Sequence, residues 1–233
     1  MVRDYDDFIR ELLRAGFSQF GGQKDSMVQV IPHTWGDEPP DSAIQWHTGD
    51  PGHDPWQWRM RALSERGDIA YAKVFFQKAG FITQEWYPYF LAVRRPHGRS
   101  FGEAYACGMM SRAAKRAYDT LRENGALPVH ELKAMAGLGR EKEEKSAFER
   151  AIAELQMGLY ITLCGQARKV SRAGEAYGWA SNMLCLTEDF WPEEVCERAA
   201  ALDPEEAAEA IEERVYKLNP GADQKKVRRF ING

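Results

Sequence analysis

Histidine, aspartate and tryptophan residues, which could take part in binding or catalysis, are concentrated in one short stretch, QWHTGDPGHDPWQWRMR, at residues 45–61. Its histidines and aspartates could bind a metal ion, and its tryptophans could stack on a nucleobase. Its prolines and glycines are typical of turns. Three interpretations therefore compete for this stretch: a metal site, a stacking platform and a turn-rich part of the fold.

The metal interpretation lacks a fixed geometry. His47 and His53 are flanked by Asp50 and Asp54, but no single helix face brings them together as an H-E-x-x-H motif would. The spacing of the cysteines matches no zinc or redox motif. These cysteines are Cys107, Cys164, Cys185 and Cys196. We therefore predict no bound metal and no other cofactor, and we interpret the cysteines as reduced, mostly buried thiols.

The tryptophans could bind a ligand or fill a core. Stacking of a base on tryptophan is worth about 1 to 3 kcal/mol, but large aromatic side chains more often pack inside a protein. Asp54-Pro55 is typical of a helix start, with the carboxylate accepting backbone N–H groups. We interpret the stretch as scaffold and keep a ligand cleft as the alternative. The residues that would line this cleft are Trp46, Asp54, Trp56 and Trp58.

A second group of residues suits a polyanion. QARKVSRAG, at residues 166–174, places Arg168, Lys169 and Arg172 between the predicted strands GLYITLCG and EAYGWASNMLCL. Such cations bind phosphates, and Lys142 and Lys145 on the preceding predicted helix could add to them. However, the segment REKEEKSAFER, at residues 140–150, contains four acidic and four basic residues, and its acidic residues would repel DNA. A solvated face with local ion pairs is the alternative.

The elements that must position these residues follow from periodicity and turn signals. We predict a helix over residues 5–15, closed by Gly16, and then an irregular aromatic-rich passage in which SMVQVI is a possible short strand. We also predict a short helix over 69–78, a strand-like GFIT, and a helix from 84 to 94 with Thr83 as its N-cap.

The Pro96-His97-Gly98 break suggests a domain boundary, which divides the chain into 1–98, 99–190 and 191–233. We predict helices over 103–123, 128–136 and 142–156, with a short extended piece before the second helix and the two strands after the third. This is the order of a winged helix, with 142–156 as the recognition helix and 166–174 as the wing. The predicted fold is α+β and predominantly α, ending in acidic C-terminal helices.

Charge and hydropathy limit the function classes. The mean hydropathy of -0.55 argues against a membrane protein, and MVRDYDDFIRELL does not resemble a secretory signal. We therefore expect a cytoplasmic protein. Residues 104–180 contain 12 basic and 9 acidic residues, whereas residues 187–218 contain 3 and 11. This small basic excess predicts weak DNA binding at physiological salt.

Several segments resemble a known bacterial family. DPWQWRMR, GDIAYAKVFFQKAGFITQEWYPYF, FERAIAELQMGLYITLCG and GEAYGW are similar to segments of the AlkZ-related proteins, over most of residues 5–190. Those proteins are in turn similar to the AlkZ/YcaQ winged-helix DNA glycosylases, so the resemblance implies a winged helix and a role in DNA repair. It also implies that the stretch at 45–61 belongs to a shared scaffold, in which Arg59 or Arg61 pairs with Asp54.

The same resemblance points to one catalytic candidate. The glycosylases use a Q-aliphatic-D/Q motif, and the nearest match in this chain is Gln19-Phe20-Gly21. Only Gln19 fits the motif, and Gly21 has no group that can orient water or stabilise a sugar cation. We expect a protein with a lost or altered catalytic motif that binds nucleic acid or a nucleobase-like ligand. The alternatives are an active glycosylase on modified bases and a module that binds another protein.

Overall fold

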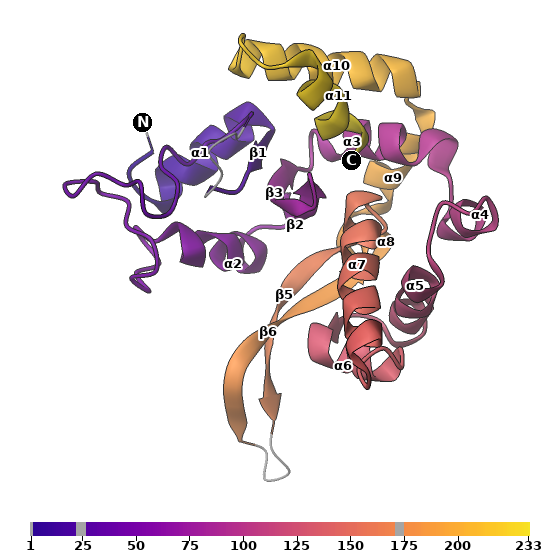
Figure 1. Ribbon diagram of the computed structural model, residues 1–233. Coiled ribbons are helices and arrows are strands. Elements are labelled where there is room, and N and C mark those ends of the chain that lie inside the picture. Colours follow the sequence, from indigo (N-terminus) through magenta and orange to yellow (C-terminus); the bar gives the residue numbers. More distant parts are fainter. Residues whose placement is uncertain (1, 22–26, 171–174) are drawn as a thin grey trace.

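The computed structural model describes residues 2–21, 27–170 and 175–233. Figure 1 shows a mainly helical molecule with two small antiparallel sheets, so the predicted mixed fold class dominated by helices is confirmed. No helix in the described ranges is long and apolar enough to span a bilayer. The apolar core is one continuous cluster that includes residues from both sheets.

The first sheet has the order β1–β3–β2 and is antiparallel. Its strands are β1 (Phe17–Gln19), β2 (Ile69–Phe75) and β3 (Lys78–Thr83). Helix α1 (Tyr5–Ala15) begins at Asp4, whose side chain accepts the Asp7 N–H, and ends at Gly16, as predicted. Helix α2 (Pro55–Glu65) follows the long irregular passage and contacts α1 through the stacked rings of Phe8 and Trp58.

Strand β2 corrects the predicted helix over 69–78. Its side chains are buried except for Lys73, because α2, α7 and β5 pack around it. A strand buried on both faces lacks the alternation of apolar and polar residues that identifies most strands. The alanines Ala70 and Ala72 made the segment resemble a helix instead. The possible strand in SMVQVI is also wrong for Met27–Ile31, which form no strand; Ser26 lies outside the described residues.

Helix α3 (Tyr87–Arg94) begins later than predicted, and Thr83 is not its N-cap. Thr83 ends β3, and both its backbone N–H and its hydroxyl donate to the Gly16 carbonyl at 2.9 Å. The 3-10 segment η1 (Pro96–Gly98) follows α3 at the predicted break in the chain. The domain limits that we placed there stay a prediction.

The second sheet has the order β4–β6–β5. Its elements along the chain are α5 (Arg112–Asn124), β4 (Leu127–Pro128), α6 (Val129–Met135), α7 (Lys142–Met157), β5 (Ile161–Val170) and β6 (Ala176–Leu186). The predicted single helix over 103–123 is wrong, because α4 (Phe101–Ala106) is separate from α5. Gly108 has a φ of 74° between them, and the Ser111 hydroxyl caps α5 by accepting the Ala114 N–H.

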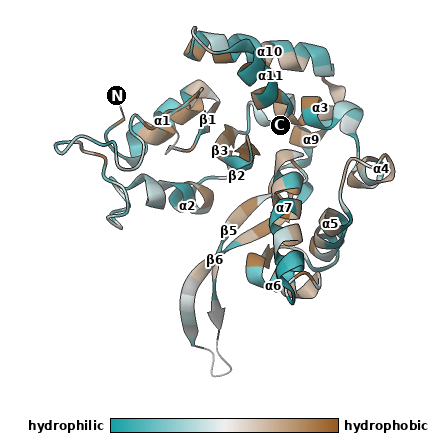
Figure 2. Cartoon of the chain, viewed as in Figure 1, coloured by the Kyte–Doolittle hydropathy of each residue, from teal (hydrophilic) through white to brown (hydrophobic). Residues whose placement is uncertain are grey.

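The C-terminal helices confirm the sequence prediction. They are α8 (Thr187–Phe190), α9 (Glu193–Ala201), α10 (Pro204–Leu218) and α11 (Gln224–Asn232). Helices α9, α10 and α11 contact α3, and the Phe230 ring of α11 stacks on Phe75 of β2 at 4.0 Å. Figure 2 shows apolar residues concentrated where β2, β3 and α3 meet, and polar residues along α10.

Arg94 joins elements that are distant in the sequence. Its buried guanidinium donates to the carbonyls of Val74, Met157, Phe230 and Ile231 at 2.8 to 3.0 Å. Burial lowers the pKa of this guanidinium to about 10. The side-chain oxygen of Gln156 likewise accepts the Lys73 N–H at 2.6 Å, which fixes the C-terminal end of α7 to β2.

Candidate functional site

Asp54 organises the aromatic stretch. Its fully buried carboxylate accepts the N–H groups of His47 at 3.0 Å, Gly49 at 2.9 Å and Trp56 at 2.8 Å. The carboxylate thus caps α2 and closes the preceding turn, as its sequence position indicated. Asp54 forms an ion pair with neither Arg59 nor Arg61 among the described contacts, so the expected pairing is wrong; Arg61 pairs with Glu65 at 2.8 Å.

The tryptophans of this stretch have different surroundings. Trp58 is fully buried against Phe8, and its indole N–H donates to the Gly52 carbonyl at 3.2 Å. Trp46 is buried against Phe20. Trp56 is 41% exposed, because it lies two residues before the buried Trp58 on α2 and so faces a different direction. Of the four cleft candidates, only Trp56 presents a large surface to solvent in this conformation.

Trp56 belongs to an exposed group of rings that we call the aromatic cluster, formed by Trp35, His47 and Trp56. The His47 ring centroid lies 5.0 Å from the centroids of both Trp35 and Trp56. Trp35 is 67% exposed. His47 has a φ of 60°, an unusual conformation that the hydrogen bond from its N–H to Asp54 helps to maintain.

Arg59 lies against the aromatic cluster. Its guanidinium carbon is 3.8 Å from the centroid of the Trp56 ring, and only 8% of the residue is exposed. Its Nε atom is buried without a hydrogen-bond partner, and no ion pair joins the guanidinium to any residue within 2–21, 27–170 or 175–233. Burial lowers the pKa of Arg59, and electrostatic interactions with Tyr71 and Asp54 oppose this shift.

Gln19 and Phe20 lie at the end of β1, next to this region. Gln19 is 1% exposed, and its side-chain oxygen accepts the Met27 N–H at 2.6 Å. The Phe20 ring contacts the rings of Trp46, Trp56 and Tyr71 at centroid distances of 5.3 to 6.3 Å. The structure therefore brings Gln19-Phe20-Gly21 and the aromatic stretch together at Phe20, while the Gln19 side chain holds the backbone at Met27.

The predicted basic loop lies on a long hairpin. Strands β5 and β6 extend further than predicted, so Arg168 and Lys169 lie within β5, and Figure 1 shows the hairpin projecting from the body of the molecule. Arg168 is exposed. Arg172 lies outside the described residues. Tyr177, which no sequence pattern singled out, pairs with Lys169 across the hairpin and is 53% exposed.

Lys142 and Lys145 are exposed near the start of α7. The C-terminal half of α7 is buried against β2, so only its N-terminal half is free to contact a partner. The Glu144 carboxylate caps the start of α7 by accepting the N–H groups of Arg140 and Glu141. These hydrogen bonds lower the pKa of Glu144. Figure 1 shows that the free end of α7 and the hairpin extend in the same direction.

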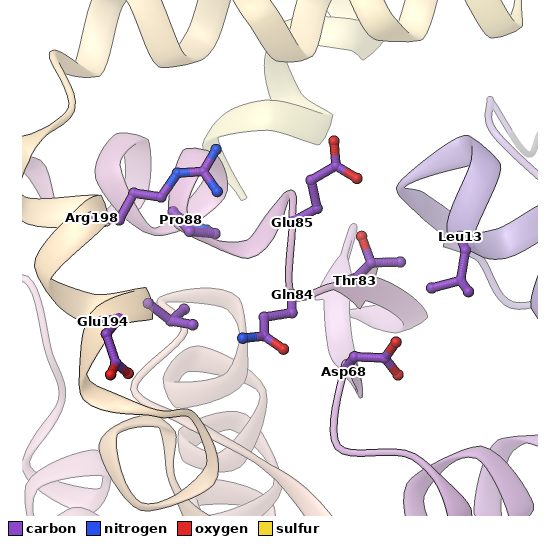
Figure 3. Close-up of a pocket in the computed structure, with 9 residues that line it drawn as sticks. Leu13, Asp68, Thr83, Gln84, Glu85, Pro88, Glu194 and Arg198 are labelled. Atoms are coloured by element: carbon purple, nitrogen blue, oxygen red, sulfur yellow. The ribbon is translucent and has the colours of Figure 1, made fainter.

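A surface hollow of about 590 Å³ lies between α9 and the connection from β3 to α3, and Figure 3 shows the residues that line it. Its acidic side chains point away from one another; they are Asp68, Glu85 and Glu194. Both carboxylate oxygens of Asp68 accept hydrogen bonds from the Arg66 guanidinium. Among the residues that the structure describes, no group of three or more histidine, cysteine, aspartate or glutamate side chains could hold a metal ion. This hollow therefore offers no metal site.

Sequence reasoning did not identify Arg59, His47 or Trp35 as parts of one surface. Trp35 is distant from Trp56 in the sequence, and no local pattern distinguishes an arginine that lacks a partner. The density of aromatic residues was the only signal. It located the region without showing which rings are exposed.

Comparison with known proteins gives one match. A family model described as AlkZ related matches residues 2–232, which is nearly the whole chain. No curated protein and no solved structure matches the chain with significance.

Proposed function

The chain belongs to the AlkZ-related family, and on this premise we propose that it binds nucleic acid through a winged helix formed by residues 112–186. The observation that carries the proposal is the projecting β5–β6 hairpin with exposed Arg168 and with Lys169 in the same strand. Arginine and lysine side chains on such a hairpin can contact the phosphates of a nucleic-acid strand.

The arrangement of the elements supports the winged-helix assignment. Helices α5, α6 and α7 precede the hairpin, and β4 pairs with β6 to complete a three-stranded sheet. In a winged helix, the last of these helices contacts DNA with its N-terminal residues. That part of α7 is the part that β2 leaves uncovered, and it contains Lys142 and Lys145.

Binding by this surface is weak in our proposal. Glu141, Glu143 and Glu149 are exposed beside the lysines and repel phosphates. Lys133 is already paired with Glu149 at 3.4 Å. The hairpin therefore supplies most of the attraction, and the affinity falls steeply as salt is added.

We further propose that the chain does not excise bases. The side-chain oxygen of Gln19 accepts a hydrogen bond from the Met27 N–H, and Gly21 carries no polar side chain for catalysis. In addition, the Trp46 ring covers Gly21 so closely that a β-carbon at this position would lie 2.8 Å from it. The aspartate or glutamine that the glycosylase motif requires at this place has no room.

The experiment is a binding titration with a fluorescently labelled duplex near 50 mM salt. The variant Arg168→Ala/Lys169→Ala/Arg172→Ala should bind more weakly than the wild type, equally for all sequences, because phosphate contacts carry no sequence information. The control is Lys225→Ala/Lys226→Ala/Arg228→Ala, which removes three exposed cations from α11. Absence of wild-type binding to duplex, single-stranded and alkylated DNA would contradict the proposal and favour a protein partner.

A second assay tests the proposed loss of catalysis. Wild-type protein incubated with alkylated duplex DNA should release no free base above the uncatalysed rate. Base release by the wild-type protein would show that the chain is an active glycosylase, and its loss in a Gln19→Ala variant that is still folded would place Gln19 in the reaction.

A further inference from the structure

Arg59 combines features that rarely occur together in one side chain. It is a cation with 8% of its surface exposed, it has a buried Nε without a hydrogen-bond partner, and it forms no ion pair with the described residues. A buried charge without hydrogen bonds is costly, and proteins normally pair such a group or neutralise it. The donors of Arg59 have no acceptor among the residues that the structure describes, which points to an external partner.

The nearest acidic group does not fill this role. Asp54 lowers the cost of the Arg59 charge through its electric field, but its oxygens accept three backbone N–H groups. The buried phenol of Tyr71 is neutral at physiological pH, because burial raises its pKa to about 12. The planar donors of the guanidinium remain suited to the oxygens of a phosphate or carboxylate.

The surroundings of Arg59 add a second requirement. The guanidinium lies on the ring of Trp56, and the aromatic cluster leaves the rings of Trp56 and Trp35 partly exposed, at 41% and 67%. Exposed aromatic rings of this kind bind flat ring systems by stacking.

We infer that Arg59 and the aromatic cluster bind an unpaired nucleotide, with the guanidinium on the phosphate and the rings of Trp35 and Trp56 against the base. A nucleotide is the ligand class that combines a flat ring with an anionic group. The preference for a nucleotide over another aromatic anion rests on the proposed function. The nucleotide comes either from a free mononucleotide or from a single strand.

The first test uses the wild-type protein and needs no variant. Calorimetric titrations compare 2′-deoxyadenosine 5′-monophosphate, deoxyadenosine, inorganic phosphate and a short oligodeoxyadenylate. The mononucleotide or the oligonucleotide should bind at least about tenfold more tightly than the nucleoside, because only they reach the guanidinium. Equal binding of nucleoside, nucleotide and oligonucleotide, or no binding of any of them, would overturn the inference. Tighter binding of the oligonucleotide assigns the ligand to a single strand, and equal binding of both phosphorylated ligands assigns it to a free nucleotide.

The second test uses matched variants. Arg59→Met should reduce nucleotide affinity to that of the nucleoside, whereas Arg61→Met should not, since Arg61 on the same helix is paired with Glu65. Trp35→Ala, at a position that is 67% exposed, should leave folding unchanged and weaken binding of nucleotide and nucleoside alike. Thermal unfolding checks that each variant is folded. Unchanged nucleotide affinity in both Arg59→Met and Trp35→Ala would overturn the inference.

The triple alanine variant of the hairpin separates this inference from the proposed function. It should retain the full affinity for the nucleotide. Nucleotide binding without any duplex binding would contradict the proposed function and leave this inference standing. Duplex binding without a preference for nucleotide over nucleoside would contradict this inference alone.

Discussion

The side-chain oxygen of Gln19 accepts a hydrogen bond from the backbone N–H of Met27 at 2.6 Å, inside the protein. Replacing Gln19 by alanine would leave that buried N–H without its acceptor. We predict that Gln19→Ala lowers the free energy of unfolding by about 1 to 3 kcal/mol, which urea denaturation measures. Gln45→Ala, at an exposed position, is the control and should have no comparable effect. A stable Gln19→Ala protein would contradict a structural role for this side chain.

Replacing Asp54 should lower the free energy of unfolding further and should also change the tryptophan fluorescence. Asp54→Ala removes the acceptor of three backbone N–H groups, so we expect a loss of about 2 to 3 kcal/mol. Tryptophan fluorescence should also shift to longer wavelength as the turn at His47 loosens and exposes the neighbouring buried ring of Trp46. Asp41→Ala, at an exposed site, provides the comparison. Wild-type stability and an unchanged spectrum in Asp54→Ala would refute this role.

Tyr71 makes stability depend on alkaline pH. Burial raises the pKa of Tyr71 to about 12 from its ordinary value of 10.0. The unfolded chain loses this proton near pH 10, whereas the folded protein keeps it until about pH 12. The contribution is therefore complete below pH 10 and is lost as the pH rises to about 12, by up to about 3 kcal/mol. Urea denaturation at several pH values should show that the wild type loses this stability relative to Tyr71→Phe. If the free energies of unfolding of the two proteins change with pH in parallel, the prediction is contradicted.

Arg94 tests how the first sheet, the end of α7 and the C-terminal helix are joined. Arg94→Met leaves the carbonyls of Val74, Met157, Phe230 and Ile231 without their shared donor. We expect a loss of at least about 3 kcal/mol, because hydrogen bonds from a charged donor are strong. Arg228→Met, on the exposed side of α11, should change the stability little when both variants are unfolded in urea. Similar stabilities of the two variants would disprove the role of Arg94.

The sequence was most informative where local signals agree. The helix α10 starts at Asp203-Pro204 and keeps one apolar face, and the β5–β6 hairpin follows from two apolar runs around a polar loop. The different directions of Trp56 and Trp58 also follow from helical geometry. In these cases a few neighbouring residues determine the structure.

The failures have tertiary causes. Strand β2 resembles a helix because neighbours cover both of its faces, and no residue within it records that burial. The absence of a partner for Arg59 depends on where Asp54 directs its oxygens and on how Tyr71 packs. Gln19 was assigned from a motif, and its hydrogen bond to Met27 depends on the path of a loop that the motif does not describe.

The salt dependence of duplex binding tests the central proposal most directly. The logarithm of the association constant should fall linearly with the logarithm of salt concentration, starting near 50 mM. Removal of Arg168, Lys169 and Arg172 should lower the slope by up to about 3, at about 0.9 for each phosphate that the variant no longer neutralises. An identical slope in the wild type and the triple variant would contradict nucleic-acid binding by the hairpin.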